Sequence, residues 1–229
     1  MKFFLFFNSL ILFGPAMLYS GVVSHFADFT SGSQAAKAQY ALVTEVADGA
    51  VMMPSGQTTD KSRHLSKIYL GTIGLMLFGS MATLALLVSA SAPGAAVWTL
   101  FLGLTGFSVI VSAYNYRAFS KIVRNYADYL TKQGGTDQGS ITHIDSEKYI
   151  YQNIILLAAT LSVLLFFPTN VLLAMQIVFA AMVATQIIAL IGATLIMPTL
   201  VKAGINKGYR DPEFIARPAP PSRAAAALH

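Results

Sequence analysis

Two long uncharged stretches separated by only two residues constrain this chain more than any other feature of its sequence. Residues 68–91 and 94–116 contain no Asp, Glu, Lys, Arg or His, and only Ala92 and Pro93 lie between them. A helix needs about 20 apolar residues to cross the hydrocarbon core of a bilayer, so each stretch is long enough. The short turn predicts a first transmembrane hairpin over residues 68–116, which enters and leaves the membrane on the same side.

The charged residues are few and are separated from the apolar stretches. They make up 11% of the 229 residues, whereas a soluble domain has about a quarter. All 15 Lys and Arg, all ten acids and all four His lie outside the apolar stretches 3–23, 68–91, 94–116, 149–167 and 171–199. We therefore predict an all-α integral membrane protein with five transmembrane helices, one N-terminal span plus two helical hairpins.

The N-terminal segment 1–23 is predicted to be the first transmembrane helix. It is apolar and rich in Phe, and Pro15 in its middle predicts a kink because proline lacks the amide donor. The alternative is a cleaved signal peptide, since Lys2 precedes the apolar core. We favour a retained helix because the small residues that a cleavage site needs are poorly placed around Tyr19 and Gly21.

The second transmembrane hairpin is predicted over residues 149–199. Its legs are residues 149–167 and 171–199, and the turn between them carries no charge. The second leg is long for one span, and Pro198 is expected to kink it or to loosen its last turn. The tail 200–229 is basic and rich in Pro and Ala, a composition typical of disordered segments.

Two polar segments connect these membrane elements. Residues 24–67 are expected to be partly helical and cytoplasmic, with Gly49 and residues 54–56 breaking the helix. Residues 117–148 begin with apolar side chains at helical spacing, so the third span is predicted to extend into the cytoplasm as a helix. A polar loop is expected to follow over residues 136–147.

The distribution of positive charge predicts the orientation. The loop 117–148 and the tail carry five Lys or Arg each, and the segment 24–67 carries four. Cytoplasmic loops of membrane proteins carry an excess of Lys and Arg. We therefore predict that all three segments are cytoplasmic, that the N-terminus is outside, and that the membrane is the bacterial inner membrane. The basic excess does not indicate nucleic-acid binding.

Small residues four positions apart predict close helix packing. Each such pair places two small side chains on one helix face, either for packing within the bundle or for docking to another membrane subunit. The pairs are Ser108 and Ser112, Ala180 and Ala184, and Ala189 and Ala193.

Side-chain amides are the strongest polar groups within the predicted spans. They have two interpretations, as the lining of a polar pathway or as interhelical hydrogen-bond partners. The amides in the legs of the two hairpins are Asn115, Gln152, Asn153, Gln176 and Gln186, and the last four are those considered for a pathway. We favour interhelical bonds, because ion-coupled transport usually needs an ionisable residue in the membrane and these spans have none.

A basic row follows the third span, formed by Arg117, Lys121 and Arg124. Such a row anchors a span at the cytoplasmic surface, or contacts anionic lipid headgroups or a protein partner. We expect no cofactor or metal site, since the chain has no cysteine and no histidine within a span.

The predicted function is therefore a non-catalytic multi-pass subunit of a larger membrane assembly, with the lipid bilayer and other membrane subunits as its partners. The alternative is a small channel or carrier for an uncharged or lipidic substrate, as a homo-oligomer. A lipid-modifying enzyme is a third class. It would need a catalytic cluster at the interface, and only His143, Asp145 and Glu147 are close enough in sequence to form one.

Overall fold

The computed structural model describes residues 1–22, 35–90, 94–132, 137–166 and 170–202, and all regular elements within them are helices. The all-helical class is therefore confirmed for this part of the chain. The elements are α1 (Lys2–Leu10), α2 (Phe13–Met17), the π-helical turn η1 (Leu18–Val22), α3 (Ala35–Lys61), α4 (Leu65–Ser89), α5 (Ala95–Lys132), α6 (Asp137–Phe166) and α7 (Val171–Lys202).

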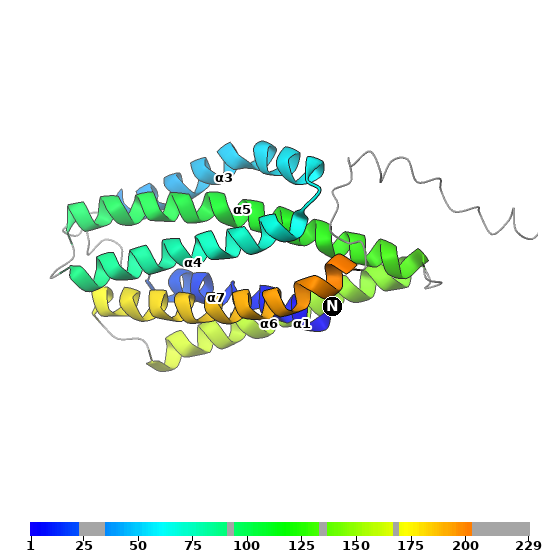
Figure 1. Cartoon of the computed structure of the whole chain (residues 1–229). Coiled ribbons are helices and arrows are strands. Elements are labelled where there is room, and N and C mark those ends of the chain that lie inside the picture. The colour runs from blue at the N-terminus through cyan, green and yellow to red at the C-terminus, as the bar shows by residue number, and fades with distance from the viewer. Residues whose placement is uncertain (23–34, 91–93, 133–136, 167–169, 203–229) are drawn as a thin grey trace, which may run out of the picture.

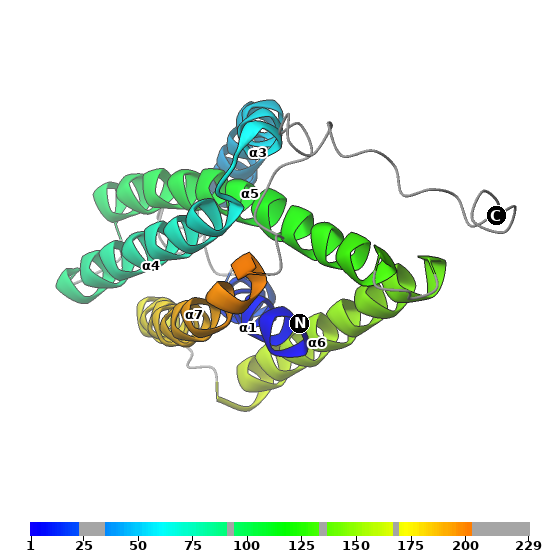
Figure 2. The same cartoon turned by 45° about the vertical axis from the view of Figure 1, so that its right-hand side comes forward.

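The helices form an elongated bundle with roughly parallel long axes (Figure 1). Their packing order differs from their order in the chain: α3 packs on α5, α5 on α4, α4 on α7, and α7 on α1 and α2, which also contact α6. The extension of α5 meets the beginning of α6 and closes one end of this arrangement (Figure 2). α3 lies at the periphery.

Four helical segments are long and apolar enough to cross a membrane. They are Leu65–Ser89, Ala95–Tyr129, His143–Leu165 and Val171–Val201, which correspond to the legs of the two predicted hairpins. A fifth is obtained if Lys2–Leu10 and Phe13–Val22, which are bent by 42°, are taken as one broken span. These helices therefore indicate that the chain is a membrane protein.

The bend in the first helical segment follows from Pro15. A proline ring clashes with the carbonyl four residues earlier, here that of Ile11, and has no amide to donate to it. The helix is interrupted at Ile11 and Leu12, whose amides bond three residues back to Asn8 and Ser9. The predicted kink is therefore confirmed, and it lies one turn before the proline.

The loop predicted at 136–147 is wrong. α6 begins at Asp137 and continues without a break to Phe166, so these polar residues form the first turns of the helix that also contains the apolar leg. The predicted helical extension of the third span is confirmed, because α5 continues to Lys132. α7 likewise runs through Pro198 to Lys202.

The helix break predicted at Gly49 and residues 54–56 is also wrong, since α3 is one helix of 27 residues that includes Pro54. Its buried side chains form one stripe that packs on α5, and this packing supports a helix whose local sequence is unfavourable. The stripe is Ala36, Ala47, Val51, Ser55 and Thr59.

The predicted placement of the N-terminus opposite the 117–148 segment is contradicted. Lys2 Nζ lies 3.0 Å from Glu147 Oε1, so the start of α1 and the polar start of α6 are at the same end of the bundle. The end of α7 lies there too (Figures 1 and 2). The prediction failed because a short N-terminus with a single Lys gives little information about its side.

The two legs of the second predicted hairpin are antiparallel, with α1 and α2 packed against both of them. This is possible because glycines remove side-chain volume where the helices approach. A Cβ on Gly192 of α7 would overlap the Phe7 ring, and one on Gly14 would overlap the Met182 side chain. The N-terminal segment is thus a structural component of the bundle.

Two apolar clusters form the core, one toward each end. The cluster near the N-terminus includes Phe4, Tyr69 and Phe119, whose rings are in mutual contact. The cluster at the opposite end includes Trp98 and Phe101, which stack at 5.4 Å. The middle of the bundle, between these clusters, is less completely filled.

Candidate functional site

A cavity of about 180 Å³ occupies the middle of the bundle. α4, α5 and α7 contribute most of its wall, and α2, η1 and α3 complete it. Its polar lining consists of Ser80, Thr83, Thr105, Ser108, Ser112 and Gln186, together with the hydroxyl-bearing Tyr40. Its apolar lining consists of Pro15, Leu18, Met76, Val109, Phe179 and Met182.

Gln186 is the most unusual polar residue in this wall. It is 3% exposed, and its Oε1 atom is buried without a hydrogen-bond partner. A buried amide oxygen without a partner costs about 1–3 kcal/mol, so such atoms are rare in proteins. Gln186 thus lines the cavity while its Oε1 atom has no partner among the described residues.

The hydroxyls on the facing helices follow from helical spacing. Ser108 and Ser112 are four positions apart on α5 and both line the cavity, as does Thr105 one turn earlier. Two hydroxyls around the cavity already bond within their own helix: Thr83 donates to the Gly79 carbonyl at 2.9 Å, and Ser112 donates to that of Val109 at 2.8 Å. The Oε1 atom of Gln186 has no such hydrogen bond within its own helix.

The other amides singled out from the sequence do not share this cavity. Gln176 donates a hydrogen bond of 2.9 Å to the Leu87 carbonyl and links α7 to α4. Gln152 and Asn153 are on α6, where Gln152 is half-buried and Asn153 is exposed, and neither lines the cavity. The four residues thus do not line one pathway.

The predicted small-residue pairs separate into buried and exposed ones. Ala189 and Ala193 are fully buried in the cluster near the N-terminus. Ser108 packs close to Gly79 of α4, where an added Cβ would lie 3.2 Å from its Oγ. Ala180 and Ala184 are exposed on the outer face of α7 and contribute nothing to packing within the chain.

The basic row after the third span does not form one surface. Lys121 forms an ion pair with Asp60 of α3. Arg117 lines an opening of about 300 Å³ between α3 and α5, together with Asp48. Arg124 lines a separate hollow of about 330 Å³, which the next helix bounds with Asp145 and Lys148. The three cations therefore have different surroundings.

The three residues considered as a catalytic cluster, His143, Asp145 and Glu147, do not share one site. Glu147 pairs with Lys2, and His143 Nε2 lies 3.6 Å from the same carboxylate, whereas Asp145 faces the hollow beside Arg124. Within the described part of the chain, no three metal-ligating side chains come together.

The feature that the sequence did not reveal is the position of α3. It runs parallel to α5, and contacts near both of its ends set the register (Figure 1). Trp98 Nε1 donates a hydrogen bond of 2.7 Å to Gln39 Oε1, and the two residues are 59 positions apart. The paired Lys121 and Asp60 are 61 positions apart. α3 therefore extends along the same depth as the apolar part of α5.

This register places one carboxylate beside the middle of a predicted span and a second closer to its end. Val43 faces Gly106, so Glu45 lies at the level of the following turn of α5, near the centre of the uncharged stretch 94–116. Asp48 instead lines the opening that also contains Ser112 and Arg117. Both acids are exposed. An Asp at the centre of a membrane costs about 2.5–3.5 kcal/mol on insertion scales.

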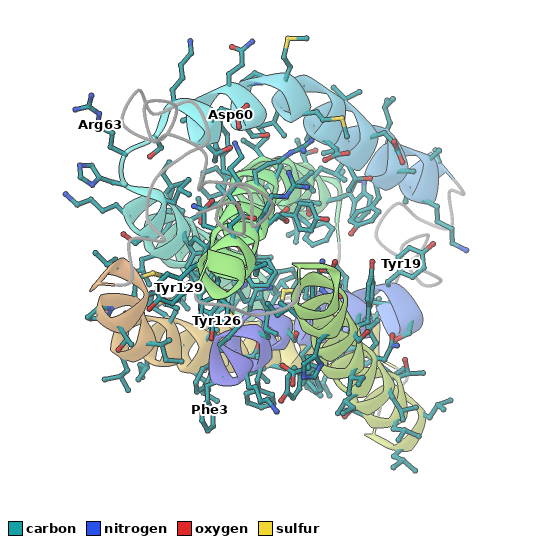
Figure 3. All side chains as sticks on the ribbon, turned by 90° about the vertical axis from the view of Figure 1, so that its right-hand side faces the viewer. Phe3, Tyr19, Asp60, Arg63, Tyr126 and Tyr129 are labelled. Atoms are coloured by element: carbon teal, nitrogen blue, oxygen red, sulfur yellow. The ribbon has the colours of Figure 1, made fainter. Side chains whose placement is uncertain are left out.

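The outer face of α3 is mixed in character. Exposed Leu42, Val46 and Met53 alternate with the two carboxylates, and Gly49 has open space around it. Viewed along the bundle, α3 forms its outer edge, with Asp60 at the near end (Figure 3). We call the exposed side chains of residues 37–57 the α3 outer face.

Comparisons of the chain with protein-family models, with curated proteins and with solved structures give no match.

Proposed function

We propose that this protein is a non-catalytic subunit of a larger membrane assembly, in which a partner protein covers the α3 outer face. The observation that carries the proposal is the exposure of Glu45 beside the middle of a span, with the exposed Asp48 three residues further along α3. Carboxylates at that depth are unfavourable against lipid and become acceptable when they pair with another protein group.

The contrast with the other outer faces supports this proposal. The largest exposed side chains of α4, α6 and α7 are apolar and suit contact with lipid, for example Phe78, Leu164 and Leu195. Only α3, among the described helices that lie along the bundle, combines an exposed acid at mid-depth with glycines that have open space around them. Lipid is thus a suitable neighbour for three of these faces, and protein for the fourth.

The chemistry of the α3 outer face indicates the kind of partner. Two acids call for Lys, Arg or a hydrogen-bond donor on the partner. Gly49 and Gly56, neither of which has an atom within 4 Å of an added Cβ, allow a helix to approach closely. We therefore propose a partner transmembrane helix that carries at least one basic residue.

Positive charge supports an orientation that differs from the one predicted from sequence. The end with Lys2 also holds Arg63, Lys67 and Arg117, whereas Lys37 is near the opposite end. We propose that the Lys2 end faces the cytoplasm of a bacterium and that the membrane is the inner one. The chain then crosses the membrane six times, with α3 as one of the crossings.

Site-specific photocrosslinking tests the proposal. A photoreactive amino acid at Val46 or Met53 is expected to capture a protein at a transmembrane peptide that contains Lys or Arg. The same group at Phe78 or Leu195 is the matched control and is expected to capture lipid only. The double substitution Glu45→Leu and Asp48→Leu should abolish protein capture from Val46 without unfolding the chain.

Two results would contradict the proposal. One is capture of lipid alone from Val46 together with isolation as a lone monomer in mild detergent. The other is protein capture that the two Leu substitutions leave unchanged. Capture of a second copy of this chain would instead favour the homo-oligomer of the carrier alternative.

The carrier alternative has one observation in its favour, the central cavity that contains Gln186. A pathway needs polar groups along its whole length, yet apolar clusters occupy the bundle on either side of this cavity. The geometry is better suited to a pocket that ends within the bundle than to a channel.

A further inference from the structure

We infer that the central cavity is a binding site for a small uncharged molecule with a hydroxyl group on an apolar body. This inference is independent of the subunit proposal, because the cavity lies between the helices of this chain and needs no residue from a partner. It rests on the size of the cavity, the Gln186 amide in its wall and a lining that combines hydroxyl groups with apolar side chains.

The cavity has the size of a small organic molecule. Its volume is about 180 Å³, and an apolar protein cavity of about 150 Å³ holds benzene. It is therefore large enough for a single six-membered ring with one or two substituents. Several helices line it and it is partly open, so a ligand could enter without unfolding the bundle.

The polar part of the wall defines the hydrogen-bonding group of the ligand. Gln186 lines the cavity and its Oε1 atom lacks a donor, so a rotation of this side chain would present the oxygen to a ligand. Thr105 and Ser108 on the facing α5 each carry a hydroxyl that both donates and accepts. A ligand hydroxyl suits both sides, because it can donate to the amide oxygen and accept from a protein hydroxyl.

The remainder of the wall defines the body of the ligand. Met76, Phe179 and Met182 are apolar, and unbranched Met side chains adapt to irregular shapes. None of the residues described around the cavity is charged. An ionised ligand would therefore be buried without a counter-charge, so the site selects neutral molecules.

Photolabelling of the full chain in lipid nanodiscs tests this inference. The probe is benzyl alcohol carrying a diazirine, and the competitors are benzyl alcohol and toluene, which differ by the hydroxyl alone. We expect saturable labelling of peptides from the cavity wall, such as those containing Met76 and Met182. Benzyl alcohol should compete roughly three- to tenfold better than toluene, the range expected for one buried hydrogen bond.

A nearly isosteric substitution isolates the contribution of the amide. Gln186→Met should remove the advantage of benzyl alcohol over toluene, while Gln152→Met, the same change outside the cavity, should preserve it. Thermal unfolding of each variant checks folding. If Gln186→Met does not fold, Thr105→Val, which exchanges a lining hydroxyl for a methyl group, should reduce the same advantage.

Three results would overturn the inference. The first is labelling of the cavity wall that does not saturate. The second is equal competition by benzyl alcohol and toluene in the unaltered protein. The third is an unchanged preference for the alcohol in both Gln186→Met and Thr105→Val. Any of these, combined with a water-filled cavity in an experimental structure, would show that water alone satisfies Gln186.

Discussion

Lys2 and Glu147 form an ion pair of 3.0 Å between the first turn of α1 and the polar beginning of α6. The first residues of the chain thus lie beside a segment 145 positions later. The start of α4 lies at this end of the bundle too (Figure 1). The chain therefore runs along the bundle and back before α4 begins, with α3 as the returning helix.

The first prediction concerns sidedness. The chain has no natural cysteine, so single cysteines report position directly. Phe3→Cys and His143→Cys, both at exposed sites, should react with a membrane-impermeant maleimide from the same side. Lys37→Cys should react from the opposite side, because α3 begins at the other end of the bundle. Reaction of Phe3→Cys and His143→Cys from opposite sides would contradict the arrangement of α1.

The second prediction concerns the close approach of α1 to α7. Gly192→Ala should destabilise the protein by about 1–3 kcal/mol, because the added methyl group meets the rigid ring of Phe7. Unfolding in a detergent titration measures the change. Gly74→Ala on α4 is the control, since its Cβ meets nothing within 4 Å and alanine favours a helix. Phe7→Leu combined with Gly192→Ala should recover part of the loss; no recovery would argue against this contact.

A third prediction concerns the ion pair between Lys121 and Asp60, which holds the end of α3 on α5. Lys121→Gln should cost about 0.2–1 kcal/mol, since the pair is only partly buried. It should also increase amide hydrogen exchange in the last turns of α3. The exchanged pair, Asp60→Lys with Lys121→Asp, should restore protection. Unchanged exchange in Lys121→Gln would show that α3 is held in place without this pair.

The fourth prediction separates two glutamines on α7. Gln176 donates to the Leu87 carbonyl, so Gln176→Met should destabilise the protein by about 0.6–2 kcal/mol, the range for hydrogen bonds between membrane helices. In ligand-free protein, Gln186→Met should be neutral or stabilising, because it removes a buried oxygen without a partner. Equal destabilisation by both changes would indicate that Gln186 has a partner after all.

The sequence alone was sufficient to predict the helices that are long and apolar enough to cross a membrane. The legs of both hairpins, the bend caused by Pro15 and the long helical extension after residue 116 all follow from length, apolar character and helical spacing. Such signals are local, because a helix satisfies its own backbone hydrogen bonds and needs only apolar side chains to be stable in a membrane.

The same reasoning failed for α3. Its residues are too polar on average to resemble a span, and Gly49 and Pro54 suggest a break. A signal was nevertheless present, since the buried residues from Ala47 to Thr59 recur every four positions. That stripe shows a helix with one buried face, although it does not identify α5 as the helix it packs on.

The cavity could not be found from the sequence either. The amides in the predicted spans look equivalent there, and Gln176 and Gln186 even lie on the same helix. Only the packing of α7 against α4 gives Gln176 a carbonyl partner and places Gln186 in the wall of a cavity that hydroxyls of α5 also line. Which neighbour a buried amide meets depends on helix order and rotation, and these are long-range properties.

The sequence by itself determined that this chain is a helical membrane protein and where its most apolar helices lie, because bilayer thickness and backbone hydrogen bonding act on each segment separately. The tertiary structure decided that the start of α1 shares an end with Glu147, that α3 runs beside α5, and that Gln186 faces a cavity. These depend on contacts between residues far apart in the chain. Small residues and individual hydrogen bonds determine these contacts. The average hydropathy of a segment carries no information about either of them.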